Sequence, residues 1–199
     1  MSYKQLNGYI DLAKLLSITD KKNYIASIHT AAQPAFDFFH NQTHLFDKTL
    51  FNKETFDELN KDSTLHAIQI NSNEIAIFSG FEHISFNLTS IDLKQHTIIV
   101  FTDLVDEVIS QQAWRSVLRT IISSVSAQYI EELRRNLNDA VPSYYIKSIF
   151  NKNVLSQKKL AQLTSSSRDT LAKQYQREKR SQTKPLSIFQ QLIQEDRCE

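Results

Sequence analysis

Cysteine, glycine and proline are scarce in this sequence, and long apolar runs are absent. The single cysteine, Cys198, has no partner within the chain, which excludes an internal disulfide and favours a reducing cytoplasmic setting. The two glycines are too few for a phosphate-binding loop of the Walker or dinucleotide type, which needs several. No stretch approaches the roughly 18 apolar residues that cross a bilayer, so we expect no association with a membrane.

The chain is nevertheless rich enough in apolar residues to fold. They make up 41% of the sequence, and aromatic side chains make up 10%, which distinguishes the chain from a disordered one. Its 199 residues suffice for one ordinary domain with a small appendage. The first twenty residues contain Asp11 and no apolar segment followed by a cleavage site, so we expect an ordinary helix there and not a signal peptide.

Patterns that would indicate catalysis or metal binding are weak. The histidines are scattered, and the best cluster, Asp37, His40 and His44, shares a face only if a helix continues through residues 41–43. Two histidines four residues apart can bind zinc, but the polar end of a helix explains this cluster better. No Ser/His/Asp arrangement with a nucleophile elbow is visible. We therefore expect no metal, no cofactor and no enzymatic activity.

Apolar periodicity predicts an α+β body. Helical spacing is found over residues 3–18 and 21–40, and Pro34 is expected to kink or divide the second helix. Four strand-like runs follow, over residues 65–70, 74–81, 83–91 and 98–101. Their connections are too short for helical crossovers, so these runs predict a four-stranded antiparallel meander.

A long amphipathic helix is predicted after the sheet, over residues 104–137, with Asp103 placed to cap it. Its apolar residues recur at three- and four-residue spacing: Val108, Trp114, Val117, Leu118, Ile121, Val125, Tyr129, Leu133 and Leu137. At 1.5 Å per residue such a helix would be about 50 Å long, more than a small sheet can cover. It either forms a dimer interface or breaks near Ser123-Ser124 and packs on its own sheet, and the sequence leaves both alternatives open.

The most informative segment has the pattern of two short helices joined by a tight turn. The helices are predicted over residues 157–164 and 168–176, with residues 165–167 as the turn. Apolar residues are spaced to bury one face of each helix against the other: Leu160, Ala161, Leu163 and Leu171. The second helix carries polar and cationic side chains outward, as a helix that reads base edges and phosphates requires. The expected DNA contacts are Lys158, Lys159, Ser167, Arg168, Thr170, Lys173 and Arg177.

The distribution of charge supports this interpretation. Residues 147–184 contain ten basic and two acidic residues, a net charge of +8, whereas residues 1–146 contain twelve basic and seventeen acidic residues, a net charge of −5. A basic block beside an acidic body is typical of a module that binds a polyanion. The bland alternative is a solvated helical surface that happens to be basic.

About twenty residues of this segment match the pattern of a known family. The matching residues are Gln157, Ala161-Gln162-Leu163, Arg168, Thr170-Leu171 and Lys173. They resemble the Fis-type helix-turn-helix, which occurs in the nucleoid protein Fis and at the C-termini of bacterial enhancer-binding activators. The resemblance implies that Arg168, Thr170 and Lys173 lie at the major groove of DNA. In this chain Ser165 stands where the family has a turn glycine.

These patterns together predict three parts: an α+β sensor or dimerisation domain over residues 1–139, a helix-turn-helix module over 140–184, and an amphipathic helix over 185–199. The expected function is DNA binding in transcription control by a dimer, because one recognition helix gives only modest specificity for double-stranded DNA. The alternative is a protein-interaction module, such as a chaperone, adaptor or phage-type inhibitor, whose basic helices dock an acidic partner. The apolar face of the last helix, which needs a surface to cover it, fits a protein partner.

Overall fold

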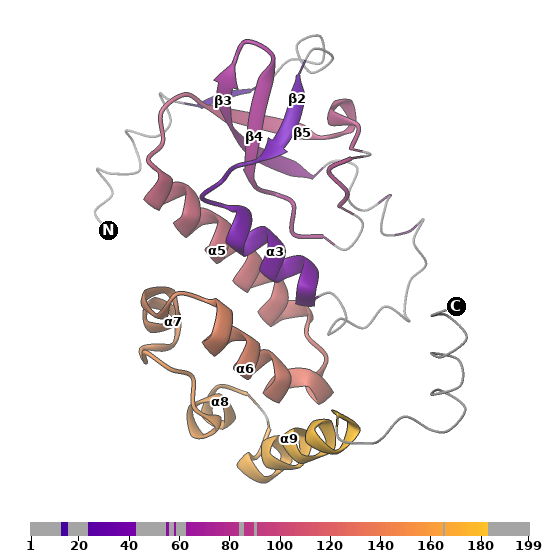
Figure 1. Ribbon diagram of the computed structural model, residues 1–199, viewed down its shortest axis with the longest axis vertical. Helices are drawn as coiled ribbons and strands as arrows, with labels where there is room; N and C mark the ends of the chain where they lie inside the picture. Colours follow the sequence, from indigo (N-terminus) through magenta and orange to yellow (C-terminus); the bar gives the residue numbers. More distant parts are fainter. Residues whose placement is uncertain are drawn as a thin grey trace, which may run out of the picture.

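The protein combines a sheet with a group of helices (Figure 1). The computed structural model describes residues 13–15, 24–42, 55, 58, 63–83, 86–89, 91–164 and 166–182. Within them, the sheet lies at one end, helices α6 to α9 lie at the other, and α3 (Gln33–Gln42) and α5 (Asp106–Ser124) lie between. The predicted α+β class is confirmed.

The described strands form one sheet in the order β1-β5-β3-β4-β2. The strands are β1 (Ala13–Leu15), β2 (Ile25–Ile28), β3 (Thr64–Asn71), β4 (Glu74–Ser79) and β5 (Thr97–Phe101). β3 pairs with β4 as an antiparallel hairpin and with β5 in parallel, so that Ala67 lies opposite both Ile77 and Val100. At the edges, β1 is antiparallel to β5 and β2 is parallel to β4.

The predicted antiparallel meander is therefore wrong, because two of the four pairings are parallel. The error begins with residues 83–91, whose described part forms turns instead of a strand. Phe86 is buried against the rings of Phe36 and Phe81, at centroid distances of 6.1 and 6.2 Å, so the apolar alternation reflects packing and not strand pairing. Without a strand here, the chain between β4 and β5 is long enough to pass to the far side of β3, where β5 pairs in parallel.

The single helix predicted over residues 21–40 is also wrong. Part of it forms the edge strand β2, and the helix α3 begins only at Gln33. Pro34 lies in the first turn of α3, where a missing N–H leaves no helical hydrogen bond unmade, so it neither kinks nor divides the helix. The helix predicted over residues 3–18 is interrupted by β1, and the remainder of that prediction lies outside the described residues.

The long helix predicted over residues 104–137 divides in two. This confirms the alternative in which the helix breaks near Ser123-Ser124 and packs on its own sheet. Helix α5 ends at Ser124, and Val125 has an extended backbone with φ −67° and ψ 133°. A short 3-10 helix, η3 (Ala127–Tyr129), then leads into α6 (Ile130–Ala140). The cap predicted at Asp103 is wrong, because the chain stays extended through Val105 and that residue provides no side-chain cap.

Helix α5 buries its apolar stripe inside the chain and so leaves no long exposed stripe of the kind that the dimer interface was expected to use. It packs on β4 and on α3. Its Trp114 contacts Phe38 of α3 at a ring-centroid distance of 5.5 Å and Tyr145 at 6.2 Å. Tyr145 belongs to α7 (Ser143–Phe150), so Trp114 joins the sheet end of the core to the C-terminal helices.

Gly80 gives the first testable prediction. Its φ is +96°, and a Cβ there would lie 2.3 Å from the carbonyl oxygen of Thr64. We expect Gly80→Ala to lower the free energy of unfolding by about 1–3 kcal/mol, because the conformation is strained and the neighbouring backbone must move. Urea unfolding measures this change. The control, Ser72→Ala in the exposed β3–β4 turn, should stay within about 0.5 kcal/mol of wild type.

We expect His66 on β3 to make the free energy of unfolding depend on pH. Its ring lies 6.0 Å from that of Phe78 and 5.9 Å from that of Phe101, and burial lowers its pKa from 6.5. The lowered pKa means that its contribution to stability is complete above pH 6.5 and is lost as the pH falls through the pKa of the folded state. We expect His66→Gln to reduce the decline of the unfolding free energy between about pH 7 and 5. An unchanged decline would contradict this role.

Candidate nucleic-acid interface

The two helices of the candidate interface begin at the predicted residues. Helix α8 (Gln157–Leu163) is capped by Ser156, whose hydroxyl accepts a hydrogen bond of 3.1 Å from the backbone N–H of Lys159. Helix α9 (Arg168–Gln182) is capped in the same way by Ser167, whose hydroxyl accepts 3.1 Å from the N–H of Thr170. Serine is a favourable residue at such positions, so both helix starts are dictated locally. Ser165 lies outside the described residues.

The predicted apolar contact between the helices is correct in part. Leu171 is fully buried, Leu160 is 7% exposed, and Ala161 packs against the same core. Leu163 is 49% exposed, so its predicted burial is wrong. Leu163 is the last residue of α8, and together with Ile122 it lines an apolar pocket of about 220 Å³.

The seven predicted contact residues are exposed, except for Lys159, which is half-buried. None of the five cations among them has a carboxylate partner within the described part of the chain. Unpaired cations on one side of a molecule attract polyanions. Ser167 has the additional role of capping α9.

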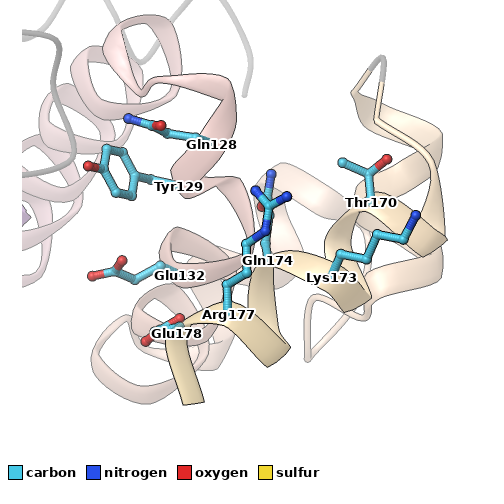
Figure 2. A pocket seen from close by; sticks show the side chains of 8 residues that line it. All are labelled: Gln128, Tyr129, Glu132, Thr170, Lys173, Gln174, Arg177 and Glu178. Atoms are coloured by element: carbon cyan, nitrogen blue, oxygen red, sulfur yellow. The ribbon is translucent and has the colours of Figure 1, made fainter. Parts of the chain in front are cut away.

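Three of these residues lie around one cleft of about 480 Å³ between α9 and the η3–α6 corner (Figure 2). Thr170, Lys173 and Arg177 line it from α9, together with Gln174 and Glu178. The opposite lining consists of Gln128, Tyr129 and Glu132, which the sequence analysis did not identify. No local pattern singles them out, because their place in the cleft depends on how α6 packs against α9.

Arg168 does not line this cleft. At 3.6 residues per turn it lies roughly 140–180° around α9 from Lys173 and Arg177. The structure therefore places the cations on two flanks of α9, whereas the sequence analysis treated them as one outward face. Lys158 and Lys159 lie on α8, also outside the cleft.

A polar contact on α9 fixes the helix against α6. The side chain of Gln174 donates a hydrogen bond of 2.9 Å to the carbonyl oxygen of Ala127 and accepts one of 3.2 Å from the backbone N–H of Glu131. The first N–H groups of a helix lack partners within it, so Gln174 satisfies the start of α6 from another helix. Nearby, Arg135 pairs with Glu178 and lies over the ring of Tyr175, 5.4 Å from its centroid. Burial lowers the pKa of Arg135, but the hydrogen bond and charge of Glu178, together with the charges of Glu131 and Glu132, outweigh burial and raise that pKa.

A buried ion pair on α6 holds the start of α8. The carboxylate of Glu131 is 1% exposed and accepts hydrogen bonds of 2.9 and 2.8 Å from Arg134 and of 2.9 Å from Gln157. Arg134 also donates 3.0 Å to the carbonyl oxygen of Leu155. Asn138 exchanges two further hydrogen bonds with the backbone of Leu155, of 3.0 and 2.8 Å.

No protein-family model, curated protein or solved structure matches this chain. Among the described residues, no three side chains of the types that ligate metals come together. The helices described here include none with the length and apolarity needed to cross a membrane.

The Glu131–Arg134 pair yields the next prediction. We expect Glu131→Ala to lower the free energy of unfolding by about 3 kcal/mol, because it leaves a largely buried guanidinium without its partner. The double variant Glu131→Gln with Arg134→Met should be closer to wild type than the sum of its single variants. Urea unfolding of the wild type, the two single variants Glu131→Gln and Arg134→Met, and the double variant measures the coupling energy between the two side chains. Glu107→Ala, on the exposed start of α5, is the control, and a similar loss in both alanine variants would contradict the role of the pair.

Proposed function

We propose that the protein binds double-stranded DNA through α9 and controls transcription. The observation that carries this proposal is the contrast between the two sides of α9. One side is anchored to the core by Leu171 and Gln174. The exposed part of α9 carries Arg168 on one flank and Lys173 and Arg177 on the other, and none of these cations has a carboxylate partner among the described residues. Fixed position and unpaired cations are what a recognition helix requires.

The proposal extends from α9 to the other parts of the chain. We propose that residues 1–139 act as a sensor or dimerisation domain, that residues 140–184 carry the DNA-binding module, and that the protein acts in the cytoplasm. Helix α6 packs on α7, α8 and α9, and thus serves as the support of the module. A dimer is part of the proposal because a single recognition helix contacts few base pairs, and two-fold sites double that number. The amphipathic segment over residues 185–199 lies outside the described residues.

A protein-interaction role is the second candidate, and one observation favours it. The apolar pocket between α5, α6 and α8 is bordered by Ile122 and Leu163, which are 46% and 49% exposed. Exposed apolar side chains around a pocket are typical of surfaces that dock another protein. Salt dependence separates the two candidates, because DNA binding releases counterions and weakens steeply as salt rises.

The test of DNA binding uses the full chain. Selection from random duplexes identifies a preferred site, and fluorescence anisotropy then measures affinity for that site and for unrelated DNA over a range of salt concentrations. We expect Arg168→Ala to lose about 1–3 kcal/mol at the preferred site and to blur the sequence preference, because a guanidinium can engage a guanine edge with two hydrogen bonds.

Lys173→Ala should act differently. We expect it to weaken binding to all duplexes alike and to lower the salt slope by about one, because a lysine at this position meets phosphate. Lys94→Ala, an exposed lysine at the sheet end, is the control and should change neither quantity. Wild-type affinity in both α9 variants, with circular dichroism showing intact folding, would remove α9 from the DNA interface and favour the protein-interaction role.

A further inference from the structure

The cleft lies beside α9 and therefore restricts how DNA can approach this helix. The major groove is about 12 Å wide and a helix with its side chains is about 10–12 Å across, so a helix in the groove has a phosphate backbone on each flank. Arg168 lies on one flank of α9, and Thr170, Lys173 and Arg177 lie on the other. Gln128 and Tyr129 line the cleft across from the second flank.

We propose that this cleft holds the sugar–phosphate backbone of one DNA strand, and that Gln128 and Tyr129 contact that strand from the body of the protein. The inference rests on the proposed DNA binding and adds a second set of contacts to it. Lys173 and Arg177 supply charge without carboxylate partners in the described chain. Gln128 supplies amide donors, and Tyr129 a hydroxyl donor, of the kinds that commonly contact phosphate oxygens.

The charges of the cleft also set where the backbone lies. Figure 2 shows Thr170 and Lys173 on one side of the cleft and Gln128, Tyr129 and Glu132 on the other, with Arg177 between. Glu178 is neutralised by its ion pair with Arg135. A strand that contacts Gln128 and Tyr129 therefore passes Arg177, whose positive charge attracts its phosphates.

Two variants of the full chain test this inference by anisotropy on the selected duplex. Gln128→Glu introduces a carboxylate into the lining of the cleft, and we expect it to weaken binding about tenfold and to lower the salt slope. Tyr129→Phe removes one donor and should weaken binding roughly twofold to tenfold. Gln69→Glu makes the same charge change on β3, at the far end of the molecule in Figure 1, and should leave affinity unchanged.

The outcomes separate this inference from the proposed function. Gln128 is exposed on η3, and circular dichroism of each variant checks that the fold is retained. If Gln128→Glu matches Gln69→Glu while Arg168→Ala still weakens binding, the cleft does not hold a strand and DNA binding by α9 stands. If the wild-type protein binds no duplex in a salt-dependent way, both the inference and the proposed function are overturned.

Discussion

The buried ion pair between Glu131 and Arg134 is the interaction on which the arrangement of the C-terminal helices depends. Glu131 accepts hydrogen bonds from Arg134 and from Gln157, the first residue of α8, while Arg134 reaches the carbonyl oxygen of Leu155. A buried ion pair contributes little net stability compared with apolar residues of the same shape. Its value here is geometric, because the same two side chains also bind Gln157 and the backbone of Leu155. The pair therefore fixes which segment lies against α6.

Helix α6 fixes α9 by a second set of contacts, and this leaves the exposed part of α9 with the charge on which the proposed function depends. Gln174 joins α9 to the start of α6, and Arg135 pairs with Glu178. The carboxylates Glu131 and Glu178 are thus paired with arginines of α6, whereas Lys173 and Arg177 have no carboxylate partner in the described chain. Because these two acids are paired with α6, they do not neutralise Lys173 and Arg177 on the surface that we propose for DNA.

Local features could be predicted from the sequence, and features that depend on distant contacts could not. The starts of α8 and α9 follow from Ser156 and Ser167, which cap the helices within three residues. The sheet was assigned wrongly because the pairing of β2 with β4, and of β5 with β3, joins segments that are far apart in sequence. In the candidate site the sequence identified the exposed cations of α9. It could not identify Gln128, Tyr129 or Gln174, whose roles exist only once α6 and α9 are packed together.

Hydrogen exchange of the full-length protein with and without its selected duplex tests the central claim most directly. The account predicts that DNA slows exchange of backbone amides in two segments that are separate in sequence, the start of α9 and the η3–α6 corner. Exchange in β3, β4 and β5 should not change, because the sheet lies at the other end of the molecule (Figure 1). Protection confined to the sheet, or protection that leaves α9 unchanged, would contradict the claim that α9, held by α6, is the surface that binds DNA.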